Sequence, residues 1–300
     1  MIEKISYCGW PNSYRIANGE VELIVTGDVG PRIIRYGFVG GQNLFKEFRD
    51  QLGRTGEPEW QPRGGHRVWI APEDPVKSYA PDNAPVRLEI VDDVLHATAP
   101  VEALTGLEKR MSVRLAPSGT SVEVVHSIRN AAAEPCEVAP WVLTMMAPGG
   151  AGIHGFPPRG THPEMLAPAN PLVMWAFTDL ADPRWRFLRK YLVLLQDPAY
   201  AVPQKLGSFN ADTWGAYLLA GELFVKRTLA AGDPRSYPDL GCSFETFTNA
   251  DFLELETLGP LRRLAAGETV EHTERWTLHR NVHITRWTDA ELDRVILPLL

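Results

Sequence analysis

Residues 21–39, VELIVTGDVGPRIIRYGFV, contain two apolar, β-branched runs with a turn-rich segment between them. The runs are 21–25 and 31–39, and residues 26–30 supply the threonine, glycine and aspartate that favour a turn. Two such runs joined by a short turn predict a β-hairpin, in which the strands are antiparallel. The hairpin therefore points to an antiparallel sheet near the start of the chain.

Similar runs continue outward from this hairpin almost to the end of the chain, at 87–90, 94–98, 107–115, 121–130, 137–146, 191–196, 213–219, 223–228, 242–248, 252–258 and 269–279. Helical signals are few: a capping box at Thr288–Glu291 predicts a C-terminal helix, and 182–188 suggests a short one. Residues 50–64 and 147–170 are predicted as loops. Without a repeat or a low-complexity linker, we predict one all-β domain over 1–300, a sandwich of two large antiparallel sheets.

The composition excludes several classes of protein. The formal net charge of −7 argues against nucleic acid as a partner, because such binding needs a basic face. No stretch of eighteen apolar residues indicates a membrane span, and the N-terminus has no apolar core of a signal peptide. The three cysteines form no C-x-x-C pair and are odd in number, so we expect a cytoplasmic location.

Residues 252–260, FLELETLGP, set two carboxylates on one face of a short strand. Side chains alternate along a strand, so Glu254 and Glu256 share a face. Their carboxylates are about 6–7 Å apart along the strand. On a cleft, this pair can perform acid–base chemistry. On a solvated face, it has no chemical role. The pattern leaves both interpretations open.

Residues 63–73, RGGHRVWIAPE, gather other side chains suited to a binding site. His66 can exchange a proton near neutral pH, and Arg67 offers forked hydrogen-bond donors. Trp69 presents a flat face on which a sugar ring can lie, and Glu73 adds a carboxylate. The glycines at 64 and 65 allow a sharp turn or a close backbone approach.

Other histidines have plainer interpretations. His126 alternates with apolar residues and is expected in the core, whereas His272 and Glu274 can form either an internal pair or part of a cleft. His154, His162 and Glu164 do not have the spacing of known zinc sites, so we predict a pocket-lining loop and no metal there. Nucleotide-binding, serine-hydrolase and zinc-protease motifs are absent from the sequence.

Four segments together resemble the galactose mutarotase-like superfamily, which includes the aldose 1-epimerases. They are the hairpin extended to residue 45, GGHRVWIAPE at 64–73, VEVVHSIRNAAAEPCEVAPWVLTMMAPGG at 122–150, and FLELETLGPLRRLAAGETVEHTERWTL at 252–278. The resemblance covers nearly the whole chain. It implies a β-supersandwich and a small-molecule sugar or sugar derivative as the partner, with no metal or redox cofactor.

Carried over residue by residue, the resemblance makes Glu256 the general base and His66 a pocket histidine that acts as acid or hydroxyl ligand. We further expect six residues to bind the substrate: Arg32, Arg67, Trp69, Glu73, Trp141 and Glu254. We therefore expect Glu256 and His66 to line one pocket. The chain departs from the family at 141–144, where WVLT has no counterpart of the histidine that serves as general acid.

The reaction that the resemblance implies is the interconversion of sugar anomers. A base takes the proton of the anomeric hydroxyl while an acid protonates the ring oxygen, and the ring opens and recloses. Two alternatives stay open. The first is a carbohydrate-binding domain without catalysis, and the second is a carbohydrate-cleaving enzyme that uses paired carboxylates.

Overall fold

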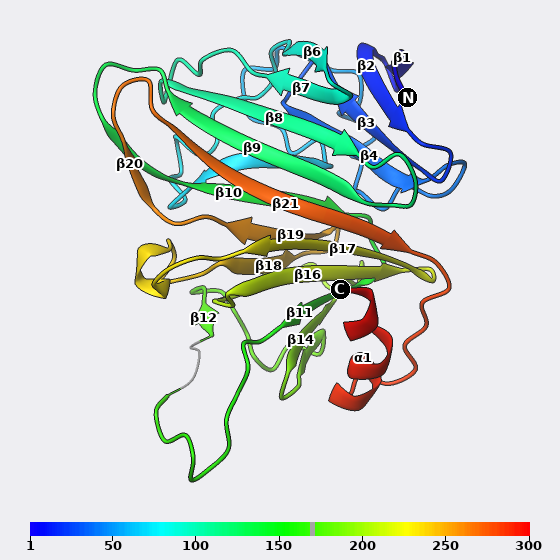
Figure 1. Cartoon of the computed structure of the whole chain (residues 1–300), viewed down its shortest axis with the longest axis vertical. Coiled ribbons are helices and arrows are strands. Elements are labelled where there is room, and N and C mark those ends of the chain that lie inside the picture. Colours follow the sequence, from blue (N-terminus) through cyan, green and yellow to red (C-terminus); the bar gives the residue numbers. More distant parts are fainter. Residues whose placement is uncertain (169–171) are drawn as a thin grey trace.

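The computed structural model describes residues 1–168 and 172–300 and consists of two large β-sheets packed face to face (Figure 1). Neighbouring strands run antiparallel in both sheets. The predicted hairpin is confirmed, with β3 paired to β4. The predicted all-β sandwich is also confirmed.

The first sheet has eleven strands. In spatial order they are β1 (Ile2–Tyr7), β2 (Trp10–Ala17), β3 (Val21–Thr26), β4 (Arg32–Phe38), β5 (His66–Ala71), β10 (Cys136–Met146), β19 (Leu253–Leu258), β18 (Phe244–Thr248), β15 (Gln204–Ser208) and β12 (Val173–Met174), with β20 (Arg262–Leu264) paired to one end of β10.

The second sheet has ten strands. Their order is β13 (Trp185–Phe187), β14 (Tyr191–Leu195), β11 (Ala151–Gly155), β16 (Asp212–Leu219), β17 (Glu222–Leu229), β21 (Thr269–His279), β9 (Val122–Asn130), β8 (Leu107–Leu115), β7 (Val94–Thr98) and β6 (Arg87–Val91).

The main core lies between the two sheets. Leu253 and Leu255 of the first sheet join Phe224 and Trp276 of the second in one buried cluster. Along each strand, these side chains alternate with side chains that point to the outer face of the sheet, as strand geometry requires. The facing apolar sets therefore fix which side of β19 carries its glutamates.

The C-terminal helix α1 (Asp289–Val295) covers part of the outer face of the second sheet (Figure 1). The hydroxyl of Thr288 accepts a 3.3 Å hydrogen bond from the backbone N–H of Glu291, which confirms the predicted cap. Two short 3₁₀ turns lie at Pro234–Ser236 and Leu297–Leu299. In the described part of the chain, no helix has the length and apolarity needed to cross a bilayer.

Two local predictions were wrong. The segment 182–188 contains strand β13 rather than a helix, because Trp185 and its neighbours pair with β14. The segment 147–170 contains β11, which pairs on both sides and holds His154 in the sheet rather than in a loop. Residues 169 and 170 of that segment lie outside the described residues.

Candidate functional site

A cavity of about 360 Å³ opens on the outer face of the eleven-stranded sheet. Arg67 and Glu254 lie in its wall. Most of the remaining lining is aromatic: Trp60, Trp69, Tyr79, Trp141, Trp175, Phe177, Phe247 and Phe252. A mainly apolar cavity of this size with a few charged groups is typical of a small-molecule site.

Strand alternation explains which side chains reach this cavity. On β5, Arg67 and Trp69 point outward while His66 and Val68 point between the sheets. Register then aligns the strands, with Trp69 opposite Trp141 and Glu254 opposite Met145. The outward side chains of β5, β10 and β19 therefore form one continuous surface.

Five of the predicted site residues line this single cavity: Arg67, Trp69, Glu73, Trp141 and Glu254. They come from the two segments that the sequence singled out, 63–73 and 252–260, and from the strand between them in the sheet. Neither glutamate of β19 is solvated, since Glu254 is 7% exposed and Glu256 is fully buried. The interpretation of this strand as an exposed polar face is therefore wrong.

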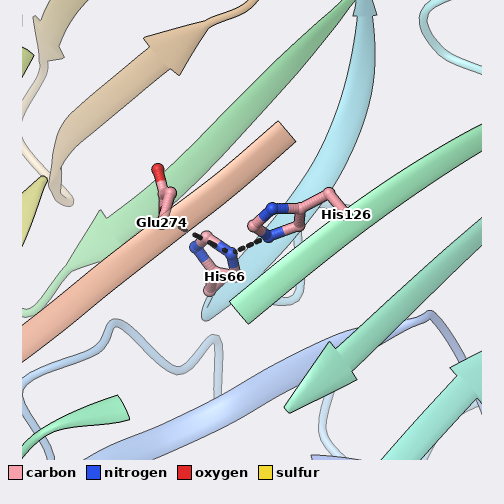
Figure 2. A group of neighbouring side chains, drawn as sticks. All are labelled: His66, His126 and Glu274. Atoms are coloured by element: carbon pink, nitrogen blue, oxygen red, sulfur yellow. Dashed lines mark hydrogen bonds and ion pairs between the residues drawn. The ribbon is translucent and has the colours of Figure 1, made fainter. Parts of the chain in front are cut away.

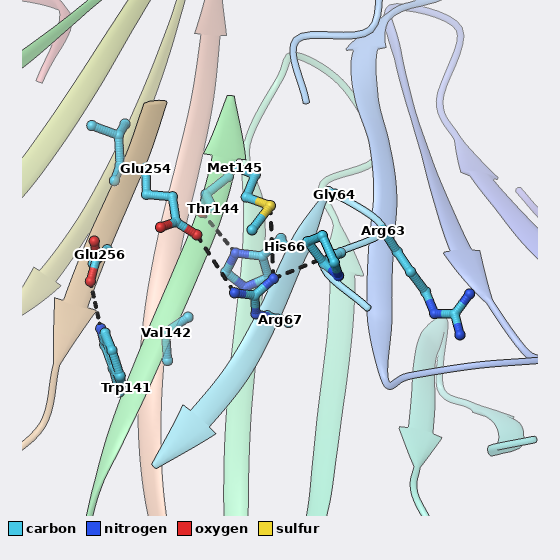
Figure 3. Close-up of polar contacts among 12 residues, drawn as sticks. Arg63, Gly64, His66, Arg67, Trp141, Val142, Thr144, Met145, Glu254 and Glu256 are labelled. Atoms are coloured by element: carbon cyan, nitrogen blue, oxygen red, sulfur yellow. Dashed lines mark hydrogen bonds and ion pairs between the residues drawn. The ribbon is translucent and has the colours of Figure 1, made fainter. Parts of the chain in front are cut away.

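Glu256 lies beneath the cavity rather than in its wall. Its Oε2 accepts a 2.7 Å hydrogen bond from Trp141 Nε1 (Figure 3) and a 3.0 Å hydrogen bond from Lys205 Nζ. Both donors line the cavity, so they stand between Glu256 and its interior. Oε1 of Glu256 is buried without a hydrogen-bond partner.

Glu254 is the carboxylate in the cavity wall. Its Oε1 has no hydrogen-bond partner, and its nearest cation, Nη2 of Arg67, is 3.6 Å away (Figure 3). Burial, and then the charge of Glu256, raises the pKa of Glu254 to about 7. Glu254 therefore exchanges its proton near neutral pH.

Both cations of the cavity are already engaged. Lys205 lies 4.6 Å from the ring centroids of Trp141 and Trp175 and bridges Glu245 and Glu256 at 2.7 and 3.0 Å. Burial opposes its charge, but the two carboxylates outweigh burial and raise its pKa above the ordinary value. Lys205 is thus a charged residue of the cavity lining, held in place by two tryptophan rings and two carboxylates.

Arg67 is held in a similar way. Its guanidinium lies 4.3 Å from the ring centroid of Trp69 and 5.0 Å from that of Trp60. Burial lowers its pKa to about 10, against the opposing influence of Glu254, so it stays charged at neutral pH.

Solved structures share this architecture. A galactose mutarotase-like protein from Lactobacillus casei ATCC 334 matches with a TM-score of 0.57 at 9% identity, over 89% of this chain and 100% of that one. A galactose mutarotase related enzyme from Lactobacillus acidophilus matches with a TM-score of 0.55 at 10% identity, over 90% and 98%. A galactose mutarotase-like protein from Clostridium acetobutylicum matches with a TM-score of 0.54 at 10% identity, over 93% and 98%.

The chain has the galactose mutarotase-like fold. Identity this low shows the fold alone. No protein-family model and no curated protein sequence matches the chain.

Within this galactose mutarotase-like fold, His66 is not in the cavity, which corrects the expectation that it shares a pocket with Glu256. Its side chain lies between the sheets with no exposed surface, 2.7 Å from Nε2 of His126 and 2.8 Å from the hydroxyl of Thr144. The physical reason is alternation: His66 precedes Arg67, and only one of two adjacent strand residues can face the cavity.

The hydrogen bonds of this internal network fix the proton positions. His126 Nδ1 donates to the carbonyl of His272, so the Nε2 of neutral His126 accepts the N–H of His66 Nε2. His66 Nδ1 then accepts from the Thr144 hydroxyl, which in turn accepts from Lys226 Nζ at 3.0 Å. Burial, then the neighbouring His126 and Lys226, holds the pKa of His66 well below its usual value. His66 is therefore neutral and cannot act as an acid in the cavity.

His272 and Glu274 form part of the same internal network. Nε2 of His272 lies 2.8 Å from the hydroxyl of Thr257, which donates to Oε1 of Glu274. Lys226 Nζ lies 2.7 Å from the same carboxylate, fully buried. Glu274 is thus internal, whereas His272 contacts it through Thr257 and also lines the groove beside β21. The expected core position of His126 is confirmed.

His66, His126 and Glu274 are the group in the described residues that could hold a metal ion, because one ligand atom of each lies within 4.8 Å of the others (Figure 2). Their atoms already have partners from the protein, and the ammonium of Lys226 is 2.7 Å from the carboxylate. An added cation would be repelled by this ammonium and would have to displace the contact between the two imidazoles. The residues present thus suit the hydrogen-bonded network better than a metal.

Arg32 also lies outside the cavity, which corrects its assignment to substrate. It is fully buried and donates to Asp82 Oδ2 at 2.6 Å and to the carbonyls of Pro62 and Gly64. It therefore anchors the segment before β5. Gly64 has φ +95°, and a Cβ there would collide with the carbonyl oxygen of Lys46, so the predicted close backbone approach is confirmed.

A larger groove of about 1030 Å³ runs beside β17, β20 and β21. It holds none of the predicted site residues. Two of its four arginines, Arg227 and Arg275, pair with Asp212 and Glu123 at 2.8 and 3.3 Å. These exposed pairs are typical of a solvated surface.

The sequence predictions missed Lys205, Trp60, Trp175 and Glu245. Lys205 lies on β15 and Glu245 on β18, while the two tryptophans lie in irregular segments. The only sequence signal for Lys205 is a single lysine in a short run between turns, QKLGS at 204–208. Its position one strand away from β19, across β18, depends on sheet order, which spans far-apart parts of the chain.

Proposed function

We propose that the chain binds a sugar in the cavity and interconverts its anomers by acid–base chemistry at the carboxylates of β19. The observation that carries this proposal is the carboxylate residue Glu254 in the wall of a cavity lined by tryptophans. Aromatic faces suit the C–H side of a sugar ring, and a carboxylate suits its hydroxyl groups.

Each residue then has a role in the proposed site. Trp69 and Trp141 stack on or border the ring, while Arg67 and Glu73 contact hydroxyl groups from β5 and the loop after it. Glu254 exchanges protons with the sugar. Glu256 lies beneath the floor and holds Trp141 and Lys205 in place.

Anomer exchange followed by NMR over a panel of aldoses tests this function. We expect the wild-type protein to exchange one sugar faster than buffer does. Glu254→Gln, which keeps shape and removes the ionisable group, should lower that rate at least 100-fold. His66→Gln serves as a control for the opposite face and should affect stability rather than the exchange rate of the folded protein. An equal rate in wild type and Glu254→Gln would contradict the proposal.

A second candidate is a carbohydrate-binding domain without catalysis. It is favoured by one observation: in the described residues no histidine lines the cavity, and Glu256 is sealed by Trp141 and Lys205. Sugar binding by calorimetry, without anomer exchange, would support this candidate. A carbohydrate-cleaving role has less support, because both carboxylates come from one strand and cannot flank a glycosidic bond.

A further inference from the structure

Strands β17 and β21 pair along only part of their length. The pairing ends at Arg227 and Arg275, and β21 extends beyond this pair as far as Thr269. The two strands diverge there (Figure 1), and the groove of about 1030 Å³ lies between them, with Leu229 of β17 and Thr273 of β21 both in its wall. The first part of β21 is therefore a strand edge that opens into the groove.

The pairing with β9 shows which backbone groups point into the groove. The backbone N–H of Asn130 donates a 2.9 Å hydrogen bond to the carbonyl of Glu268, so residue 268 faces β9. Backbone groups of successive strand residues point to opposite sides, and β21 pairs with β9 without a register shift. Thr269, Glu271 and Thr273 therefore direct their N–H and C=O groups into the groove, where residues 1–168 and 172–300 provide no backbone partner for them.

An unpaired strand edge can accept a further strand through main-chain hydrogen bonds. Proline and β-bulges commonly prevent such pairing. Residues 269–274, TVEHTE, contain no proline, and their pairing with β9 has no bulge. The edge is thus regular and open to an extended segment.

The charges of the groove favour an acidic segment. Of its four arginines, Arg227 and Arg275 are neutralised by the ion pairs described above. Arg262 and Arg263 of β20 are exposed and form no ion pair within the described parts of the chain. Outside the two ion pairs, the groove has one carboxylate, that of Glu271. Two free guanidinium groups in a chain of net charge −7 form a local site for carboxylates.

The groove also offers apolar contacts. Leu229 is 81% exposed, and Tyr237, Leu258 and Pro260 lie in the same lining. Side chains alternate along an added strand. A segment that alternates acidic and apolar residues would therefore match both kinds of lining.

We propose that β21 binds an extended acidic segment of a partner protein, which adds a strand along residues 269–273 and places carboxylates beside Arg262 and Arg263. The groove shares no lining residue with the aromatic cavity. This inference therefore does not depend on the proposed function.

Amide hydrogen exchange followed by NMR tests whether the edge is free. In the protein alone, the amides of Thr269, Glu271 and Thr273 should exchange faster than those of Val270 and His272, which face β9. A blocked peptide of about six residues, alternating glutamate and valine, should slow exchange at the first three by roughly 10-fold and leave the other two unchanged. Slow exchange at all five in the protein alone would show that the edge is already paired and overturn the inference.

Matched peptides test the two kinds of contact by calorimetry. A lysine–valine peptide of the same length should bind roughly 10-fold more weakly, because it faces the two free arginines. Methylation of alternate peptide nitrogens should weaken binding similarly, because it removes donors to the strand edge. The double change Arg262→Gln and Arg263→Gln should weaken binding of the glutamate–valine peptide.

The control for the arginine variant is the double change Arg110→Gln and Arg114→Gln, which removes two exposed arginines of β8 outside the groove and should leave binding unchanged. Protection of the amides that face β9 shows that each variant is folded. Binding that survives methylation but is lost with Arg262 and Arg263 would show capture of an anion without an added strand and overturn the inference. No binding of the glutamate–valine peptide at millimolar concentration would also overturn it.

Discussion

Trp141 and Glu256 lie on neighbouring strands, and the indole Nε1 of Trp141 donates a 2.7 Å hydrogen bond to the fully buried carboxylate of Glu256. The same ring forms part of the cavity wall. A single side chain thus supplies the apolar surface on one side and a partner for a buried charge on the other.

Replacing Trp141 by phenylalanine should destabilise the protein more than the same change at Trp60. Both changes remove a comparable part of a ring, but Nε1 of Trp60 has no hydrogen-bond partner. Loss of a hydrogen bond to a buried charge costs about 1–3 kcal/mol. Urea unfolding of the two variants measures the difference. Equal free energies of unfolding would show that the Trp141–Glu256 hydrogen bond does not contribute.

Replacing Lys205 by methionine should cost about 3–5 kcal/mol of the free energy of unfolding, because it leaves two buried carboxylates without their cation. Lys190→Met provides the matched control, since Lys190 pairs with Asp293 at the surface, and that change should cost at most about 1 kcal/mol. Adding Glu245→Gln to Lys205→Met should recover part of the loss. A similar cost at both lysines would contradict the buried bridge.

Glu254→Gln and Glu256→Gln should change stability in opposite directions at pH 8.5. At that pH the protein keeps an unpartnered, ionised Glu254 in a buried site, so Gln there should leave stability unchanged or raise it by about 1 kcal/mol. Gln at 256 weakens the contacts of Trp141 and Lys205 and should lower stability by about 1–3 kcal/mol. Thermal unfolding of both variants against wild type measures this contrast.

Stability should fall as the pH drops below about 6.5, the ordinary pKa of histidine. Burial lowers the pKa of His126 and His154 to about 4 and of His272 to about 3, so the unfolded chain binds more protons in this window. Each excess proton costs about 1.4 kcal/mol per pH unit.

The raised pKa of Glu254 acts in the opposite direction between its ordinary value and about 7, because there the folded chain binds the extra proton. Glu245, whose pKa burial also raises, acts in the same direction as Glu254. His66, whose pKa burial lowers, adds to the other three histidines, so the net slope keeps the sign set by the four histidines. The check is urea unfolding at pH 7, 6 and 5. A free energy of unfolding that stays constant from pH 7 to 5 would show that these histidines are not buried in neutral form.

Much of the site could be predicted from local sequence. Arg67, Trp69 and Glu73 follow one another within a short segment, and Glu254 alternates with the leucines of β19. The error at His66 has a simple origin. A sequence shows that His66 and Arg67 alternate, but it does not show which of the two faces the cavity and which the opposite sheet.

The sequence by itself determined many of the strands, the hairpin at 21–39, the capped C-terminal helix and the shared face of Glu254 and Glu256, because each depends on alternation or spacing over a few residues. Only the tertiary structure decided that Glu254 lies in the cavity wall while Trp141 and Lys205 cover Glu256. That difference depends on the order in which β10, β19, β18 and β15 pair across the sheet. Burial and the charges of neighbouring strands, rather than the glutamates themselves, give the two carboxyl groups different chemistry.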